Sequence, residues 1–102
     1  MIYMKISQMD EEQLRRLAEV MKAMAHPVRL RILCHLRREP CNVGQLQEIL
    51  GKDQPMVSQQ LRILRLNGLV DSQRREGHVY YSLEEEKSQF IERILGSLCG
   101  CL

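Results

Sequence analysis

Residues 42–68 carry the pattern that most constrains the fold, because they predict two short helices separated by a tight turn. Asn42 is a suitable N-cap for the helix "VGQLQEILG", which Gly51 closes. The second helix begins after "KDQ", with Pro55 near its first position, and continues through "PMVSQQLRILRL". Asn67-Gly68 then favours the left-handed backbone that ends a helix. This arrangement predicts a helix-turn-helix.

The hydrophobic period changes directly after this motif. Val79, Tyr81 and Leu83 alternate with the residues between them, which is the spacing of a β-strand. The stretch "LVDSQRR" precedes them, with Glu76-Gly77 between, so the segment predicts a β-hairpin. A helix-turn-helix followed by a basic hairpin is a winged helix-turn-helix, and the hairpin is its wing. The predicted wing tip carries three potential phosphate donors, Arg74, Arg75 and His78.

Three further helices are expected around the motif. The first, "DEEQLRRLAEVMKAMA", has apolar residues at helical spacing, and His26-Pro27 ends it. Pro27 suits the first position of the next helix, "PVRLRILCHLRR", which Glu39-Pro40 ends. A last helix extends from about Glu84 to Cys99. The predicted order is α-α-α-α-β-β-α, a mainly α fold with a β-hairpin wing. The first and last helices have wide apolar faces that the short elements between them cannot cover, so they are the predicted dimerisation surfaces.

The composition is that of a single globular domain spanning residues 1–102. Hydrophobic residues make up 44% of the chain and charged residues 27%, which excludes a disordered protein. No apolar run approaches the length of a membrane span, and the N-terminus "MIYMKISQMD" lacks the apolar stretch of a signal peptide. We therefore expect a cytoplasmic protein without membrane association. In that compartment cysteines are kept reduced, which favours metal binding or redox chemistry over a structural disulfide framework.

The charge distribution and the helix-turn-helix indicate a surface for double-stranded DNA. Between Arg15 and Arg38 basic residues far outnumber acidic ones, since Glu19 is the single acid there. The N-terminal residues of the second helix of such a motif meet the base edges. Glutamine can form a bidentate contact with adenine, and serine can contact a base or a phosphate. The predicted DNA-binding residues are Gln54, Met56, Ser58, Gln59, Gln60 and Arg62 in this helix and Arg74, Arg75 and His78 in the wing.

Three stretches together resemble the ArsR/SmtB family of bacterial winged-helix repressors: "AMAHPVRLRILCHL", "VGQL" and "QPMVSQQLRILRLNGLVDSQRREGHVYYSL". The resemblance extends from about Val20 to Leu83. It implies a homodimer that binds a palindromic DNA operator and releases it when an inducer binds. Members of the family sense metal ions, metalloids or redox-active sulfur species, at sites that differ between branches.

The cysteine pattern is similar to that of the BigR, SqrR and HlyU-like branch of the family. That branch has one cysteine within an "ILC-x-L" stretch of the second helix and another near the end of the last helix. Cys34 in "RILCHL" matches the first, and Cys99 in "IERILGSLC" resembles the second if one deletion is allowed. The resemblance implies that these thiols form a disulfide or polysulfide bridge that weakens DNA binding. The implied inducer is a persulfide, a polysulfide or an oxidant, and no cofactor is required.

Two further cysteines keep a second hypothesis open. Cys99 and Cys101, with either Cys34 or Cys41, would supply three thiolates for trivalent arsenic, antimony or another soft metal ion. The family's thiolate stretch "ELCVCDL" is incomplete here, because "EPCNVGQL" has only Cys41, and its zinc site on the last helix would lack histidines. His26, in "HPVRL", is assigned to the connection between the first two helices and not to a metal.

Nothing in the sequence predicts an enzyme. No C-x-x-C follows a βαβ pattern, and there is no Gly-rich phosphate loop or nucleophile elbow. The other class of protein that the sequence leaves open is a protein-interaction module with a vestigial winged helix. Salt-dependent binding to promoter DNA would exclude it. The sequence therefore predicts a dimeric DNA-binding repressor whose operator affinity is set by cysteine chemistry, through either Cys34 and Cys99 or the metalloid set.

Overall fold

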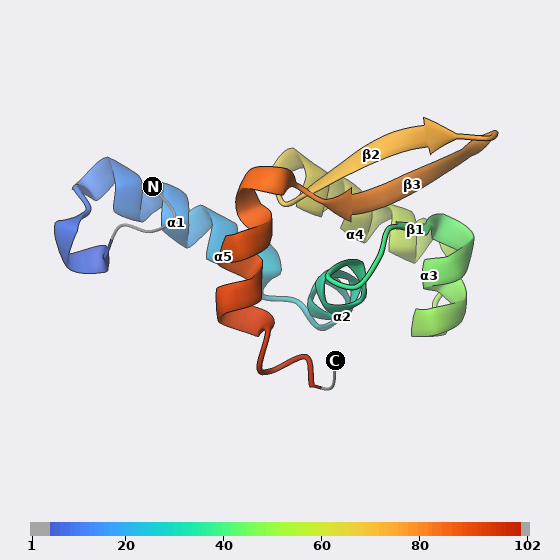
Figure 1. Cartoon of the computed structure of the whole chain (residues 1–102), viewed down its shortest axis with the longest axis horizontal. Coiled ribbons are helices and arrows are strands. Elements are labelled where there is room, and N and C mark those ends of the chain that lie inside the picture. The colour runs from blue at the N-terminus through green and yellow to red at the C-terminus, as the bar shows by residue number, and fades with distance from the viewer. Residues whose placement is uncertain (1–4, 101–102) are drawn as a thin grey trace.

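The computed structural model describes residues 5–100, and within this range it has five α-helices, a short 3₁₀ helix and a three-stranded sheet (Figure 1). The order confirms the predicted mainly α fold with a β-hairpin wing. In chain order the elements are η1 (Ile6–Gln8), α1 (Glu11–Met24), α2 (Pro27–Leu36), β1 (Cys41–Asn42), α3 (Val43–Leu50), α4 (Gln54–Leu66), β2 (Val70–Arg75), β3 (His78–Leu83) and α5 (Glu85–Leu95).

Side-chain caps fix where the helices of the central motif begin. The Asn42 carboxamide oxygen accepts a hydrogen bond from the Gln45 N–H at 2.8 Å at the start of α3, as predicted. Gly51 ends α3 with φ of 66°, a left-handed conformation that favours glycine. The start of α4 is one residue earlier than expected, because the Asp53 carboxylate caps it by accepting from the Met56 N–H at 3.0 Å.

Two helices end earlier than the sequence predicts. Helix α2 ends at Leu36, two residues before the expected end, and Arg37 and Arg38 continue as a turn. Helix α5 ends at Leu95, and Cys99 lies in the turn that follows. The N–H groups of Leu98 and Cys99 both donate to the Leu95 carbonyl, at 2.9 and 2.7 Å, so the chain curls back instead of continuing the helix.

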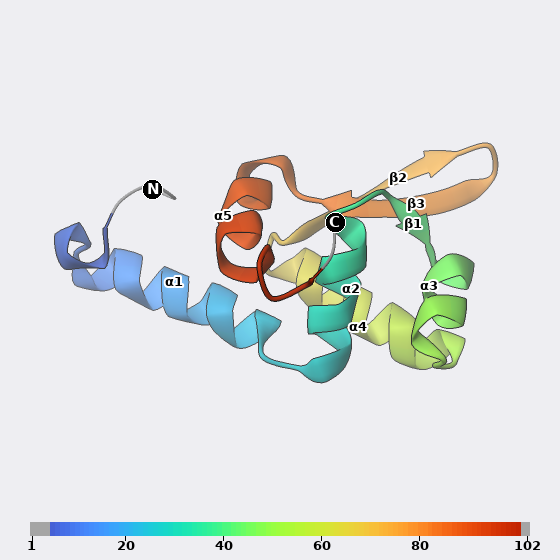
Figure 2. The same cartoon turned by 60° about the horizontal axis from the view of Figure 1, so that its bottom comes forward.

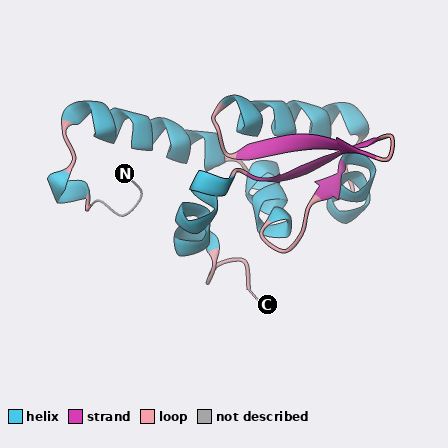
Figure 3. Ribbon diagram, turned by 45° about the horizontal axis from the view of Figure 1, so that its top comes forward, coloured by secondary structure: helices cyan, strands magenta, loops and turns pink. Residues whose placement is uncertain are grey.

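The sheet has the order β1-β3-β2, and both pairings are antiparallel. Arg75 pairs with His78, which leaves Glu76 and Gly77 as a two-residue turn with φ of 50° and 82°. The hairpin runs past α4 and projects from the helical body (Figures 1 and 3). Strand β1 was not predicted, because its two residues are too few to show a period; it pairs Cys41 with Tyr81.

The core is aliphatic and lies between the helices and the base of the hairpin. Its fully buried side chains come from every element between α2 and α5 except β1 and β3; they are Ile32, Leu33, Leu46, Val57, Leu61, Leu64, Leu69, Val70 and Ile91. Helix α1 extends from one end of this body and the wing from the other (Figure 2), over a length of 43 Å. None of the helices between residues 5 and 100 combines the length and the apolar character needed to cross a bilayer.

Candidate DNA interface and cysteine pair

The first turns of α4 present a polar surface. The Gln54 Nε2 donates to the Ser58 Oγ at 2.7 Å, one turn further along the helix. Gln59 and Arg62 are exposed. Gln54, Ser58 and Arg62 are spaced four residues apart and therefore share one face of α4. Their places suit the predicted DNA contacts, which stay predictions.

Gln60 is buried, unlike the exposed Gln59 beside it. Its side chain is only 7% exposed, and its Nε2 donates to the Met56 Sδ at 3.6 Å. This burial disfavours a contact with a base edge, and the DNA contact of Gln60 stays a prediction. The physical reason for the burial is its place on the helix, beside the fully buried Leu61 and one turn after Val57. Met56 is half-buried and packs against the core, so only part of it is accessible to DNA.

A basic groove continues from this face toward the sheet. It has a volume of about 360 Å³ and is lined by Ser58, Arg62, Arg65, Leu66 and Tyr81. Tyr81 was not predicted to lie on this surface, because strand spacing alone does not show which helix a strand residue faces. The groove joins β3 to α4, which is the helix predicted to contact the bases and is called the reading helix below. Together they form one cationic surface that suits a phosphate backbone.

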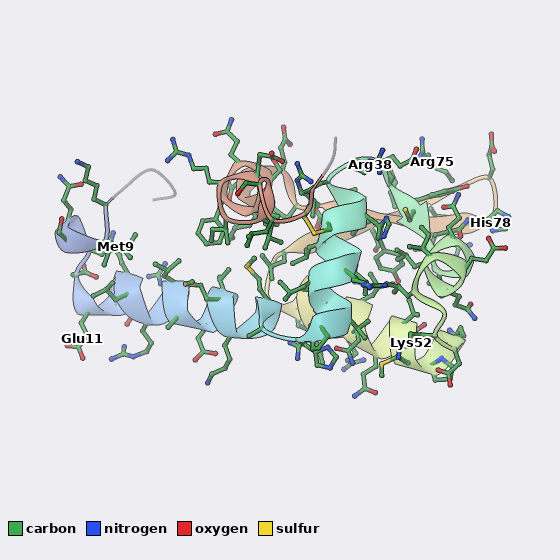
Figure 4. All side chains as sticks on the ribbon, turned by 90° about the horizontal axis from the view of Figure 1, so that it is seen from below. Met9, Glu11, Arg38, Lys52, Arg75 and His78 are labelled. Carbon is green, nitrogen blue, oxygen red and sulfur yellow. A yellow bond between two sulfur atoms is a disulfide. The ribbon has the colours of Figure 1, made fainter. Side chains whose placement is uncertain are left out.

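The wing tip places its three predicted donors within a few residues of one another. Arg75 and His78 are opposite each other in the antiparallel register, and both lie at the end of the hairpin (Figure 4). The Arg75 guanidinium lies over the Tyr80 ring, 5.0 Å from its centroid, a cation–π contact that restrains the side chain. Arg74 is the neighbouring strand residue and therefore projects on the opposite face of the hairpin.

Cys34 and Cys99 are joined by a disulfide, although 65 residues separate them in the sequence. Cys34 lies in α2 and Cys99 in the turn after α5, and both are half-buried. Their Cα atoms are 5.6 Å apart. The pairing that the family resemblance implied is therefore present in this structure, and the bond ties the end of α5 to α2 (Figure 4).

An ion pair ties the same two elements. The Arg37 Nε donates to the Glu92 Oε1 at 2.7 Å, and the Arg37 Nη2 donates to the Glu92 Oε2 at 2.9 Å. The hydrogen bonds of this contact raise the pKa of Arg37 and lower that of Glu92, and the attraction between the two charges adds to both shifts. This contact between Arg37 and Glu92 was not predicted from the sequence. No local spacing could have shown the pair, since its members are 55 residues apart.

Cys41 is a free thiol in a different setting. It is 4% exposed, and its Sγ lies 3.6 Å from the Glu39 carbonyl oxygen, to which it can donate. Burial, and after it the Glu39 charge, raises the pKa of the Cys41 thiol, so the reactive thiolate is disfavoured. Between residues 5 and 100, no group of three or more His, Cys, Asp or Glu side chains is arranged to hold a metal ion. Cys101, the other candidate ligand, lies outside the described residues.

Known families and proteins include sequences similar to this chain. The family described as "Bacterial regulatory protein, arsR family" matches residues 26–72. The biofilm growth-associated repressor of Xylella fastidiosa (strain 9a5c) is 34% identical over 91 residues, which cover 88% of this chain and 80% of that protein. The chain belongs to the arsR family.

Solved structures share the fold of this arsR-family chain. HlyU from Vibrio cholerae N16961 superposes with a TM-score of 0.81 and 34% identity, covering 89% of this chain and all of that one. A second structure, described as reduced HlyU from the same organism, has a TM-score of 0.79 and 33% identity, covering 86% of this chain and 93% of that one. These likenesses extend well beyond the helix-turn-helix, to most of the chain.

Within the segment that matches the arsR family, His26 has the structural role that the sequence predicted. It precedes α2, and its Nδ1 accepts a hydrogen bond from the Val28 N–H at 3.1 Å, which caps the helix. The matched segment contains Cys34 and the reading helix but not Cys99. The cysteine pair therefore joins the matched segment to the turn that follows α5, outside that segment.

Proposed function

We propose that this arsR-family chain is a homodimeric transcriptional repressor that binds a palindromic operator while Cys34 and Cys99 are reduced. Formation of a bridge between the two thiols releases the operator. The observation that carries the proposal is the Cys34–Cys99 bond, because it connects α2, which packs against the reading helix α4, with the end of α5. The described reduced form of HlyU supports redox chemistry in a protein of this fold.

An apolar surface on α1 supports the dimer. Leu14 is 38% exposed and Met21 48% exposed, and both lie on one face of a helix that extends away from the core. Covering this face with the same face of a second copy would place two α4 helices about a two-fold axis, as a palindromic site requires. A bridge that pulls α5 against α2 then changes the distance between the two reading helices.

The bridging step needs an acceptor for two electrons. With a disulfide oxidant, one cysteine thiolate displaces a thiolate from the oxidant, and the second cysteine loses its proton and displaces the other. The inducer we propose is an oxidant or a persulfide or polysulfide, which reacts at the same two sulfurs. Trivalent arsenic or another soft metal ion, held through Cys99 and Cys101 with Cys34 or Cys41, is the alternative inducer, and no cofactor is needed for either.

The test is operator binding by the purified chain, measured reduced, after treatment with a sulfane-sulfur donor, and separately after arsenite. Mass spectrometry of the same samples locates any bridge. We expect loss of binding together with a Cys34–Cys99 bridge. Cys34→Ser should bind the operator but no longer respond, and Cys41→Ser is the matched control that should respond normally. A Cys34→Ser protein that still releases DNA on induction would contradict the proposal, and release by arsenite alone would favour the metalloid site.

A further inference from the structure

We infer that the Arg37–Glu92 ion pair is a positioning element of the cysteine switch, which holds the end of α5 against α2 so that the two thiols meet. The inference rests on the proposed function, since it concerns the same cysteine pair. It goes beyond it by assigning a role to two residues that do not react and are not among the predicted DNA contacts.

The geometry of the ion pair is that of a specific contact. Its two hydrogen bonds, at 2.7 and 2.9 Å, join two guanidinium N–H groups to the two oxygens of one carboxylate, which is the bidentate arrangement. The Arg37 side chain is only 9% exposed, whereas Glu92 is 57% exposed. The arginine is therefore held in place by its surroundings, and the glutamate comes to it from a separate helix.

The ion pair and the disulfide lie along the same junction. Arg37 comes three residues after Cys34, which is about one helical turn. Glu92 comes seven residues before Cys99, on the helix that leads to it. Helices α2 and α5 also contribute to one apolar core, in which Leu36 and Leu95 are both buried. When the disulfide is reduced, the ion pair is a direct polar contact that remains between these two parts of the chain.

Gly96 leaves the space that this contact occupies. A Cβ at position 96 would collide first with the Glu92 backbone carbonyl oxygen, and it would lie 2.5 Å from the Glu92 Oε2 and 3.1 Å from its Cδ, so a side chain there would disturb both the end of α5 and the carboxylate. Gly96 directly follows the last residue of α5 and keeps helical backbone angles. The absence of a side chain at this position thus permits the carboxylate to lie over the helix end.

The expected effect follows from the chemistry of disulfide exchange. A cysteine thiolate attacks oxidised glutathione and releases one glutathione thiolate, which leaves a mixed disulfide. The second cysteine then loses its proton, attacks the mixed disulfide and releases the second glutathione. This last step depends on the effective concentration of one protein thiol at the other. An ion pair that restricts the end of α5 raises that concentration, and by linkage the disulfide strengthens the ion pair.

The experiment measures this equilibrium on the full chain without DNA. The protein is equilibrated in buffers of graded reduced and oxidised glutathione, alkylated, and analysed by mass spectrometry for the Cys34–Cys99 bond. Glu92→Gln should lower the equilibrium constant for bridge formation by about threefold to fivefold, the size expected for a half-exposed pair. Arg37→Gln should have the same effect. The equilibrium constant of the double variant should be no lower than that of either single variant, because each substitution removes the same contact.

A matched control separates this role from a general effect of charge or folding. Glu86→Gln removes the same charge from an exposed position of the same helix and should leave the constant at the wild-type value. Added salt should shrink the difference between wild type and Glu92→Gln. Circular dichroism and gel filtration confirm that each variant is folded, and Arg37→Gln provides an independent second removal of the contact.

The outcomes distinguish the inference from the proposed function. Wild-type constants for both Glu92→Gln and Arg37→Gln would overturn the inference, and so would full additivity in the double variant. If the wild-type chain formed no Cys34–Cys99 bond in any glutathione buffer, both the inference and the proposed function would fail. If the variants shifted as expected but the bridged wild-type protein bound its operator as tightly as the reduced one, the inference would stand and the proposed function would fail.

Discussion

At Gln60 the chain buries an amide that its environment does not fully satisfy. The Oε1 atom is buried without a hydrogen-bond partner among the described residues, which costs free energy, while the Nε2 has only a thioether acceptor. Gln60→Met should therefore raise the free energy of unfolding by about 1 kcal/mol, measured by urea denaturation. It should leave operator affinity unchanged, whereas Gln59→Ala on the exposed face should weaken binding without altering stability. Weaker operator binding by a folded Gln60→Met protein would show instead that Gln60 contacts the operator.

Glu92 gives the protein a defined dependence on pH. The hydrogen bonds from Arg37 lower the pKa of Glu92 below its usual value near 4.3, so its stabilising contribution is present above that value. The contribution is lost as the pH falls through the depressed pKa of the folded state. The difference in urea midpoint between the wild type and Glu92→Gln should therefore be constant from about pH 7 to pH 5 and shrink toward pH 3. A difference that grows on acidification would be inconsistent with the ion pair.

Among the elements, the wing permits a quantitative test of phosphate contact. Each phosphate that a protein neutralises adds about 0.9 to the slope of log affinity against log salt concentration. Arg74 is exposed near the hairpin tip, so Arg74→Ala should reduce the slope by about 1.8 in a dimer that uses both wings. Operator titrations over a series of salt concentrations measure it. Lys5→Ala, at an exposed position ahead of α1 and outside the basic stretch from Arg15 to Arg38, is the control and should leave the slope unchanged.

The same elements show how far the sequence predicts this fold. Helices with caps and wide apolar faces were found because their signals are local: Asn42 and Gly51 bound α3, and Glu76-Gly77 forms the expected hairpin turn. Strand β1 was missed, since it forms by pairing with β3, which is distant in sequence. The early end of α5 was also missed, although hydrogen bonds within the same segment mark it. The Cys34–Cys99 pairing was predicted through the family resemblance alone. The Arg37–Glu92 pair had no local signal. The sequence offers many possible pairs of opposite charges, and the folded arrangement of α2 and α5 decides which of them meet.

At the scale of the whole molecule, the described structure separates the parts that the proposed function must couple. The wing lies at one end of the molecule, whose longest dimension is 43 Å, and α1 lies at the other end (Figure 2). The cysteine pair and the ion pair lie between them, where α5 meets α2. A change at this junction can thus alter how the reading helices of two copies are held apart while leaving each DNA-binding surface intact.

This coupling must act in both directions. If bridging Cys34 to Cys99 weakens operator binding by some factor, saturating operator must disfavour the bridge by the same factor, because the two equilibria share one thermodynamic cycle. Adding operator DNA to the glutathione equilibration should therefore shift the population toward free thiols by the ratio of the operator affinities of the reduced and bridged proteins, each measured separately. DNA of the same length and scrambled sequence is the control and should shift it far less. An operator that left the thiol population unchanged, while oxidation still abolished binding at equilibrium, would violate that cycle; it would show that release follows a reaction other than formation of this bridge.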